Sequence, residues 1–189
     1  SRIDKALAFE WTAEGLKDRF DLTFILLNPG DSVLERWLRE KGVRVLRVPY
    51  RGKADLPSAF FRLFSLMRRE KPDAVHPHLF DATLIGLTAA RLAGVRTRVS
   101  PRHARPFHHP YSPKAVKYDL WNNRLATSII SISQATDEAL LRLEGAPAAK
   151  LVKIPHGFDL SYFESVPPER VREVARRWSI PETGPRVGV

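Results

Sequence analysis

Hydrophobic and polar positions along the chain follow two alternating periodicities. Apolar residues every three or four positions predict amphipathic helices, and short apolar or alternating runs predict strands. The predicted helices cover residues 4–17, 32–41, 55–70, 79–93, 115–125, 134–143 and 168–178. The predicted strands cover residues 20–27, 43–48, 73–76, 97–100, 127–132, 151–154 and 186–189. This alternation predicts parallel pairing and a doubly wound α/β sheet.

Local signals mark several boundaries of these elements. Ser32 and Glu35 have the spacing of a capping box, in which each side chain binds the backbone N–H of the other residue. Asp55 is a predicted N-cap, and Gly94 is a predicted helix stop. Residues 101–113 are rich in proline and histidine and form a predicted loop.

Composition narrows the class of protein. The 189 residues suffice for one well-buried domain, and 43% hydrophobic and 28% charged residues are ordinary for a soluble globular chain. The absence of cysteine excludes disulfides and thiolate metal sites, and it suits a reducing cytoplasm. No segment approaches the roughly 18 to 20 apolar residues of a membrane span. We therefore expect a cytoplasmic protein.

The charge balance is unusual, with a net charge of +10 and a pI near 10.3. Residues 96–124 hold seven Lys or Arg and one acidic residue, Asp119. Such a surface attracts phosphates, nucleic acid or anionic lipid headgroups, so peripheral contact with the inner face of a membrane is one expectation. A solvated basic face that only aids solubility explains the charge equally well.

Polar residues follow four of the predicted strands. Ligands bind beyond the carboxyl ends of the strands in doubly wound sheets, near the switch in strand order. The residues at these positions are His78, His103, Ser133 and His156. The sequence therefore predicts a binding site built from these loops.

His76 and His78 share a face of extended backbone, which makes a metal pair conceivable. No third ligand follows at a suitable spacing, and Pro77 distorts the geometry, so we expect no metal. His78 also has a purely structural interpretation, in which it satisfies local backbone groups.

Three further residues suit anion binding. Arg102 and Arg105 carry the planar donors that match phosphate. Ser133 is placed to cap the helix 134–143, whose N-terminal N–H groups attract an anion. Simple capping by Ser133 explains the same pattern, and the two roles are compatible.

Three segments, residues 75–82, 99–103 and 154–163, resemble glycosyltransferase family 4. The last reads Ile-Pro-His-Gly-Phe-Asp and resembles the Ile-Pro-Asn-Gly-Val-Asp-x-x-x-Phe signature that ends the N-terminal domain of those enzymes. His156 stands where asparagine is usual, and Phe158 stands where valine is usual.

The resemblance implies one half of the two-domain GT-B architecture. Residues 1–183 would form the N-terminal, acceptor-side, Rossmann-like domain, and residues 184–189 the linker and the start of a C-terminal donor domain. The family begins with a strand and a Gly-Gly loop, whereas this chain begins at or before the first helix. We therefore expect a gap in the sheet.

The resemblance also implies residue roles. His103 would be the catalytic residue beside the reacting sugar, and His78 would face the cleft between the domains. His156 and Gly157 would line the cleft on the hinge side, with Arg102, Arg105 and Ser133 as further substrate-binding residues. Such enzymes are retaining and need no metal, because the donor's own phosphate accepts the acceptor's proton.

The expected function is hexosyl transfer from a nucleotide-sugar co-substrate to a lipid-linked, polysaccharide or small-molecule acceptor, without nucleic acid. By itself this chain should be inactive, because most nucleotide-sugar contacts belong to the second domain. The basic residues 96–117 would assist approach to a membrane. One alternative is a basic α/β module that binds nucleic acid or phosphorylated ligands. Another is a structural domain whose open sheet slot pairs with a partner chain.

Overall fold

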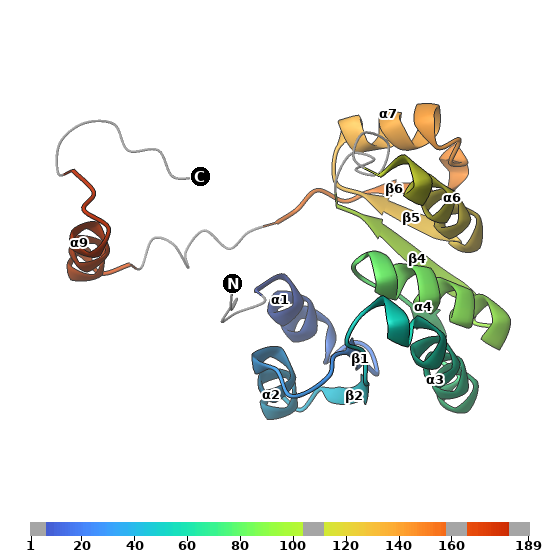
Figure 1. Cartoon of the computed structure of the whole chain (residues 1–189), viewed down its shortest axis with the longest axis horizontal. Helices are drawn as coiled ribbons and strands as arrows, with labels where there is room; N and C mark the ends of the chain where they lie inside the picture. Colours follow the sequence, from blue (N-terminus) through green and yellow to red (C-terminus); the bar gives the residue numbers. More distant parts are fainter. Residues whose placement is uncertain (1–6, 104–111, 158–165, 182–189) are drawn as a thin grey trace. The chain divides into compact units, whose positions relative to one another are not determined.

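A computed structural model of the chain describes residues 7–103, 112–157 and 166–181. The chain divides into two compact units, Ser1–Pro155 and His156–Val189 (Figure 1). The predicted boundary between residues 183 and 184 and the predicted strand 186–189 lie outside the described residues, so both stay predictions.

Helices and strands alternate as the sequence predicts. The helices are α1 (Leu7–Leu16), α2 (Val33–Glu40), α3 (Leu56–Glu70), α4 (Phe80–Ala93), α6 (Val116–Leu125), α7 (Gln134–Leu143) and, in the second unit, α9 (Pro168–Arg177). The strands are β1 (Thr23–Leu27), β2 (Arg44–Val48), β3 (Ala74–Val75), β4 (Thr97–Arg102), β5 (Ser128–Ser131) and β6 (Leu151–Lys153). Short 3-10 turns precede α3, α6 and β6; they are η1 (Lys53–Asp55), η2 (Pro113–Ala115) and η3 (Ala148–Lys150). Every described α-helix and strand except β4 lies within its predicted range, whereas the 3-10 turns were not predicted.

The described strands form two parallel sheets, one of β1–β2 and one of β3–β4–β5–β6. The predicted parallel α/β class is therefore confirmed. Among the described strands no ladder joins the two sheets, which agrees with the expected gap in the sheet.

Helices cover both faces of β1. Alternate side chains of a strand point to opposite faces, and in β1 apolar side chains on both faces pack against helices. Phe24 packs into a core built on α1 and α2, with Ala13 and Leu38 fully buried. Ile25 and Leu27 face the other way, into a core that α3 and α4 supply. That second core contains Val48, Ala59, Leu63, Met67, Ile85, Ala89, Ala90 and Val95. The doubly wound arrangement follows from this division of one apolar strand.

The expectation that β4 ends at residue 100 is wrong, because the strand continues through Pro101 to Arg102. Proline lacks the N–H that a ladder needs, so it is confined to positions whose N–H side has no partner. β3 pairs with β4 only at Thr97 and Arg98, and beyond them β4 pairs with β5 alone. Pro101 therefore sits in the strand without removing a ladder bond, and the predicted loop begins two residues later.

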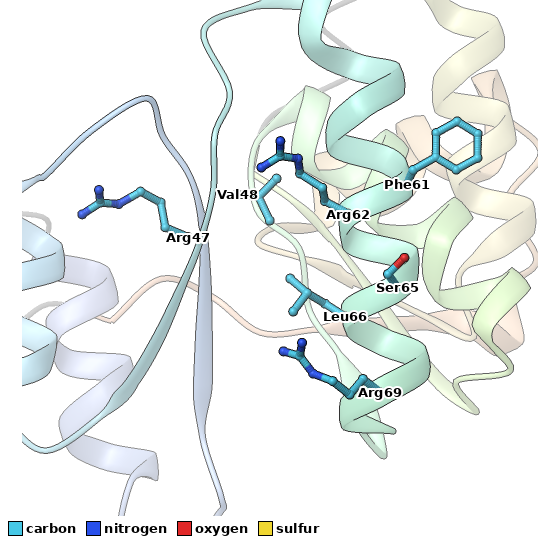
Figure 2. Close-up of a pocket in the computed structure, with 7 residues that line it drawn as sticks. All are labelled: Arg47, Val48, Phe61, Arg62, Ser65, Leu66 and Arg69. Carbon is cyan, nitrogen blue, oxygen red and sulfur yellow. The ribbon is translucent and has the colours of Figure 1, made fainter.

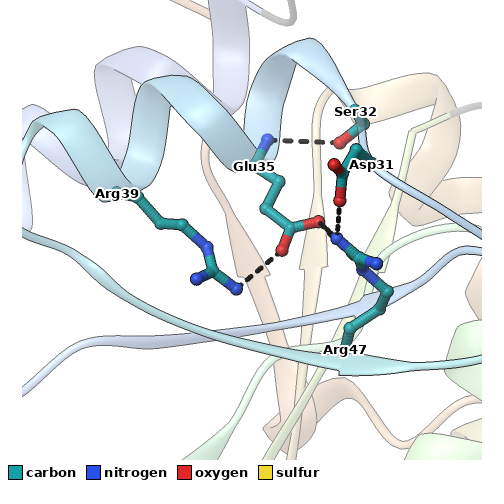
Figure 3. Close-up of polar contacts among 5 residues, drawn as sticks. All are labelled: Asp31, Ser32, Glu35, Arg39 and Arg47. Atoms are coloured by element: carbon teal, nitrogen blue, oxygen red, sulfur yellow. Dashed lines mark hydrogen bonds and ion pairs between the residues drawn. The ribbon is translucent and has the colours of Figure 1, made fainter.

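Only one of the two hydrogen bonds of the capping box predicted at the start of α2 forms. Ser32 Oγ accepts from the backbone N–H of Glu35 at 3.2 Å, as predicted. The Glu35 carboxylate instead binds Arg39 Nη2 at 2.8 Å and Arg47 Nη2 at 2.7 Å (Figure 3). Arg47 also pairs with Asp31. Glu35 is buried, so two arginines neutralise it and join α2 to β2.

Asp55 occupies the N-cap position of α3 but makes no side-chain capping bond. It ends η1, so its backbone is already helical and its carboxylate cannot reach forward as an N-cap does. The carboxylate accepts from the backbone N–H of Arg51 at 2.8 Å instead. Gly94 does end α4, with a left-handed φ of 83°.

None of the helices within the described ranges is both long and apolar enough to cross a membrane.

Candidate functional site

The carboxyl ends of β3, β4 and β5 lie side by side, and the segments that follow them carry the candidate polar residues. His76 and His78 follow β3, His103 follows β4, and Ser133 begins α7 after β5. The structure brings His78 and His103 together, as the sequence predicts, and places His76 beside His78.

The histidine rings form a continuous group. The rings of His76 and His78 have centroids 4.3 Å apart, and His78 stacks on His103 at 5.7 Å with 22° between the planes. Phe9 of α1 meets His78 edge to face at 5.0 Å. We call His76, His78 and His103 the histidine cluster. In the part of the chain that the structure describes, no three His, Asp or Glu side chains are placed to hold a metal ion. The expectation of a metal-free site stays a prediction.

The environment of the cluster disfavours positive charge. Burial lowers the pKa of His78 to about 4, with further lowering by His76 and His103. Burial also lowers the pKa of His76, and His103 adds to that effect. Both rings are therefore neutral at pH 7, and each offers one hydrogen-bond donor and one acceptor. Such rings suit sugar hydroxyls, which also donate and accept.

Two site-edge residues escaped the sequence analysis, Tyr50 and Asp81. The Tyr50 hydroxyl donates to the Asp81 carboxylate, which joins the segment after β2 to the first turn of α4. Burial and the Asp81 carboxylate raise the pKa of Tyr50 to about 12, so the hydroxyl keeps its proton. Tyr50 follows a strand end by two residues, and the same rule that selected His78 would have found it.

The His78 loop has a constrained backbone. Leu79, which precedes α4, has a φ of 69°, a left-handed value that costs a non-glycine residue about 1–3 kcal/mol. Its side chain is 78% exposed, so core packing does not explain the conformation. Gly86 of α4 approaches Pro77 so closely that a Cβ there would lie 3.2 Å from Pro77 Cβ. The strain and the close approach both fall beside His78.

Arg102 points into the protein. Its guanidinium pairs with Asp119 at 3.4 Å and with Glu144, whose side chain has no exposed surface. Asn123 Nδ2 donates to the same Glu144 carboxylate at 2.6 Å. A phosphate would have to displace one of these carboxylates to bind Arg102. Arg105, the second predicted phosphate ligand, lies outside the described residues.

Ser133 caps α7, as predicted. Its Oγ accepts from the backbone N–H of Thr136 at 3.2 Å. The N-terminus of α7 follows the carboxyl end of β5, and a helix N-terminus favours an anion. His156 and Gly157 open the second unit, which is described by itself, so their predicted roles stay predictions.

Comparisons with known proteins identify the family. The model of glycosyltransferase family 4 matches residues 11–162. An Escherichia coli relative, UDP-Gal:alpha-D-GlcNAc-diphosphoundecaprenol alpha-1,3-galactosyltransferase, is 30% identical over 106 residues, covering 53% of this chain and 27% of the relative.

Solved structures share the fold. Anabaena HepE in complex with UDP has a TM-score of 0.67 at 18% identity, covering 95% of this chain and 48% of that one. Acinetobacter baumannii MurG has a TM-score of 0.58 at 15% identity, covering 84% and 43%. The chain thus spans about half of these proteins or less, as one domain of a GT-B architecture does. The family match extends over most of the sequence, and the chain belongs to glycosyltransferase family 4.

Proposed function

We propose that the chain is the acceptor-side half of a retaining, metal-independent hexosyltransferase that moves a sugar from a nucleotide-sugar to a lipid-linked acceptor. The observation that carries the proposal is the histidine cluster at the carboxyl ends of parallel strands in a family 4 domain. The proposed acceptor can also be a polysaccharide or a small molecule.

The names of similar proteins support a uridine nucleotide and a lipid-linked acceptor. The Escherichia coli relative is named for UDP-Gal and for a diphosphoundecaprenol-linked GlcNAc. The Anabaena structure holds UDP. We infer UDP-hexose as the donor class and a polyprenyl diphosphate sugar as the acceptor class.

In this proposal His103 is the catalytic residue and contacts the reacting sugar. His78 stacks on it and, being neutral, orients a hydroxyl by hydrogen bonding without adding charge. Positioning of two substrates supplies much of such a rate enhancement, so no protein nucleophile is required. The donor's own phosphate accepts the proton of the acceptor hydroxyl.

In this proposal the first anion-binding position is the N-terminus of α7 beside Ser133, because the positive end of a helix dipole favours a phosphate. Arg105, His156 and Gly157 are the remaining proposed substrate-binding residues. Arg102 joins them only if substrate displaces Asp119 or Glu144 from its guanidinium. This half alone is proposed to be inactive.

The test uses the intact enzyme with UDP-hexoses and a polyprenyl diphosphate-linked GlcNAc acceptor. We expect transfer that continues in excess chelator, with retention at the anomeric carbon. His103→Ala should lower kcat by about 100-fold or more, as loss of a transition-state contact does. Arg142→Ala, an exposed change on α7, is the control and should keep full turnover. The proposal is refuted if the enzyme shows no sugar transfer and no donor hydrolysis with any UDP-hexose tested. Unchanged turnover of His103→Ala would remove His103 from the proposed mechanism.

A further inference from the structure

One side of α3 faces solvent and combines cations with an aromatic ring. Ala59, Leu63 and Met67 are buried on the opposite side of the helix. We call the exposed side the α3 face; it consists of Phe61, Arg62, Ser65, Arg68 and Arg69. The Phe61 ring is 65% exposed, so it does not contribute to the core.

An open groove of about 410 Å³ runs between α3 and β2. Figure 2 shows Arg62, Leu66 and Arg69 extending from α3 toward β2, whereas Phe61 and Ser65, which also line the groove, extend away from β2. Val48 supplies an apolar wall of the groove. The groove therefore places two guanidinium groups at the edge of an apolar floor.

The cations of the α3 face retain charge that the protein does not neutralise. Within the described ranges, Arg62 and Arg68 form no hydrogen bond or ion pair. Arg69 pairs with Glu70, but Glu70 is shared with Arg44 at 2.6 Å. Residues 44–71 hold eight Lys or Arg against two acidic residues.

In the other basic segment, residues 96–124, the side chains of two arginines bind groups of the protein itself. Arg98 donates to the carbonyl groups of Val95 and Leu125, and the side chain of Arg102 is only 12% exposed between its two carboxylates. Arg98 and Arg102, two of the six cations in the segment 96–117 that is predicted to approach a membrane, thus bind groups of the protein itself. The α3 face is a second cationic surface, on which Arg62, Arg68 and Arg69 are exposed.

We propose that the α3 face docks the protein on an anionic bilayer surface. Arginines bind lipid phosphates in forked pairs, and an exposed phenylalanine gains free energy where headgroups meet acyl chains. The groove receives a lipid headgroup between Arg62 and Arg69, above Leu66 and Val48. This inference rests on the proposed lipid-linked acceptor and gives that function a surface of contact, in a place different from the basic loop.

The experiment is co-sedimentation of the intact protein, without donor or acceptor, with vesicles of phosphatidylcholine alone or mixed with phosphatidylglycerol. We expect binding to the mixed vesicles only, weakening as salt is raised. Arg62→Glu with Arg68→Glu should reduce partitioning by about 30-fold, because each basic residue near an anionic surface contributes about a factor of five. Arg36→Glu with Arg142→Glu, which makes the same change of net charge on α2 and α7, should retain most of the binding.

Phe61→Ser provides a second test that keeps the charge. It should weaken partitioning several-fold while the salt dependence stays the same, since only the apolar contribution is removed. Equal binding to neutral vesicles, or equal loss in both charge-reversal variants, would overturn the proposal. Tighter binding to an oligonucleotide than to mixed vesicles, abolished by the same α3 changes, would also overturn it. Sugar transfer is measured separately, so vesicle binding fails or succeeds independently of the proposed activity.

Discussion

The ring of Phe9 meets the ring of His78 edge to face, with centroids 5.0 Å apart and an angle of 89° between the planes. Phe9 comes from α1, and His78 comes from the segment after β3, almost seventy positions later in the chain. An apolar ring from the first helix therefore helps to shield a candidate substrate-binding histidine from water.

Removing the Phe9 ring should raise the pKa of His78. Burial is the main cause of its low value of about 4, so Phe9→Ala readmits water and moves the pKa toward 6.5. NMR titration of the imidazole resonances measures the shift. Phe61→Ala, which removes an exposed phenylalanine from α3, should leave the His78 pKa unchanged, and equal shifts in both variants would contradict the assignment.

Stability should depend on pH through His78. Its folded pKa of about 4 lies below the unfolded value of about 6.5, so the unfolded chain binds more protons between these limits. The free energy of unfolding should therefore fall by about 2 kcal/mol as the pH drops from 6.5 to 4. Urea denaturation at several pH values measures this loss. His78→Gln should show a smaller loss, and an unchanged pH profile would assign the effect to other groups.

Gly86→Ala should disturb the His78 loop. The added methyl group would lie 3.2 Å from Pro77 Cβ, so Pro77 must move by a few tenths of an ångström. We expect altered ring resonances for His76 and His78 and reduced turnover of the intact enzyme. Gly15→Ala is the matched control, because a Cβ on Gly15 of α1 meets nothing within 4 Å. That change should raise stability by about 0.5–1 kcal/mol through helix propensity and leave the histidine resonances unchanged.

Glu144→Gln should destabilise the fold strongly. It leaves the Arg102 guanidinium buried with only the longer contact to Asp119, and loss of one buried partner costs about 3–5 kcal/mol. Chemical denaturation measures the change in the free energy of unfolding. Glu173→Gln removes the carboxylate of an exposed Arg170 pair on α9 and should cost less than about 0.5 kcal/mol. Equal losses of unfolding free energy in the two variants would mean that water screens the charges of Arg102, Asp119 and Glu144.

The periodicity of the sequence predicts the class of fold and most element positions, because each helix or strand buries its own apolar face. Pairing between distant residues has no such local signature. The sequence marks Arg102 as a phosphate ligand, but Asp119 and Glu144 reach it from other elements. Glu35 shows the same limit, since its capping-box spacing was overridden by Arg47 on the neighbouring strand.

The candidate site was partly predictable for a related reason. Strand ends can be read from the pattern, and in a parallel sheet they meet at one edge, so His78 and His103 were expected to be neighbours. Phe9 lies in the predicted helix 4–17, but nothing in the local sequence shows that this helix reaches the loop after β3.

The break between the two sheets has a mechanical consequence. Among the described strands no backbone ladder crosses from β1–β2 to β3–β6, so side-chain contacts hold the two groups together, above all the apolar core supplied by α3 and α4. Dispersion contacts between apolar side chains have no preferred direction, whereas a ladder of hydrogen bonds resists shear along its whole length. A cavity at Met67 would therefore uncouple the two groups, and hydrogen exchange would report two opening units instead of one.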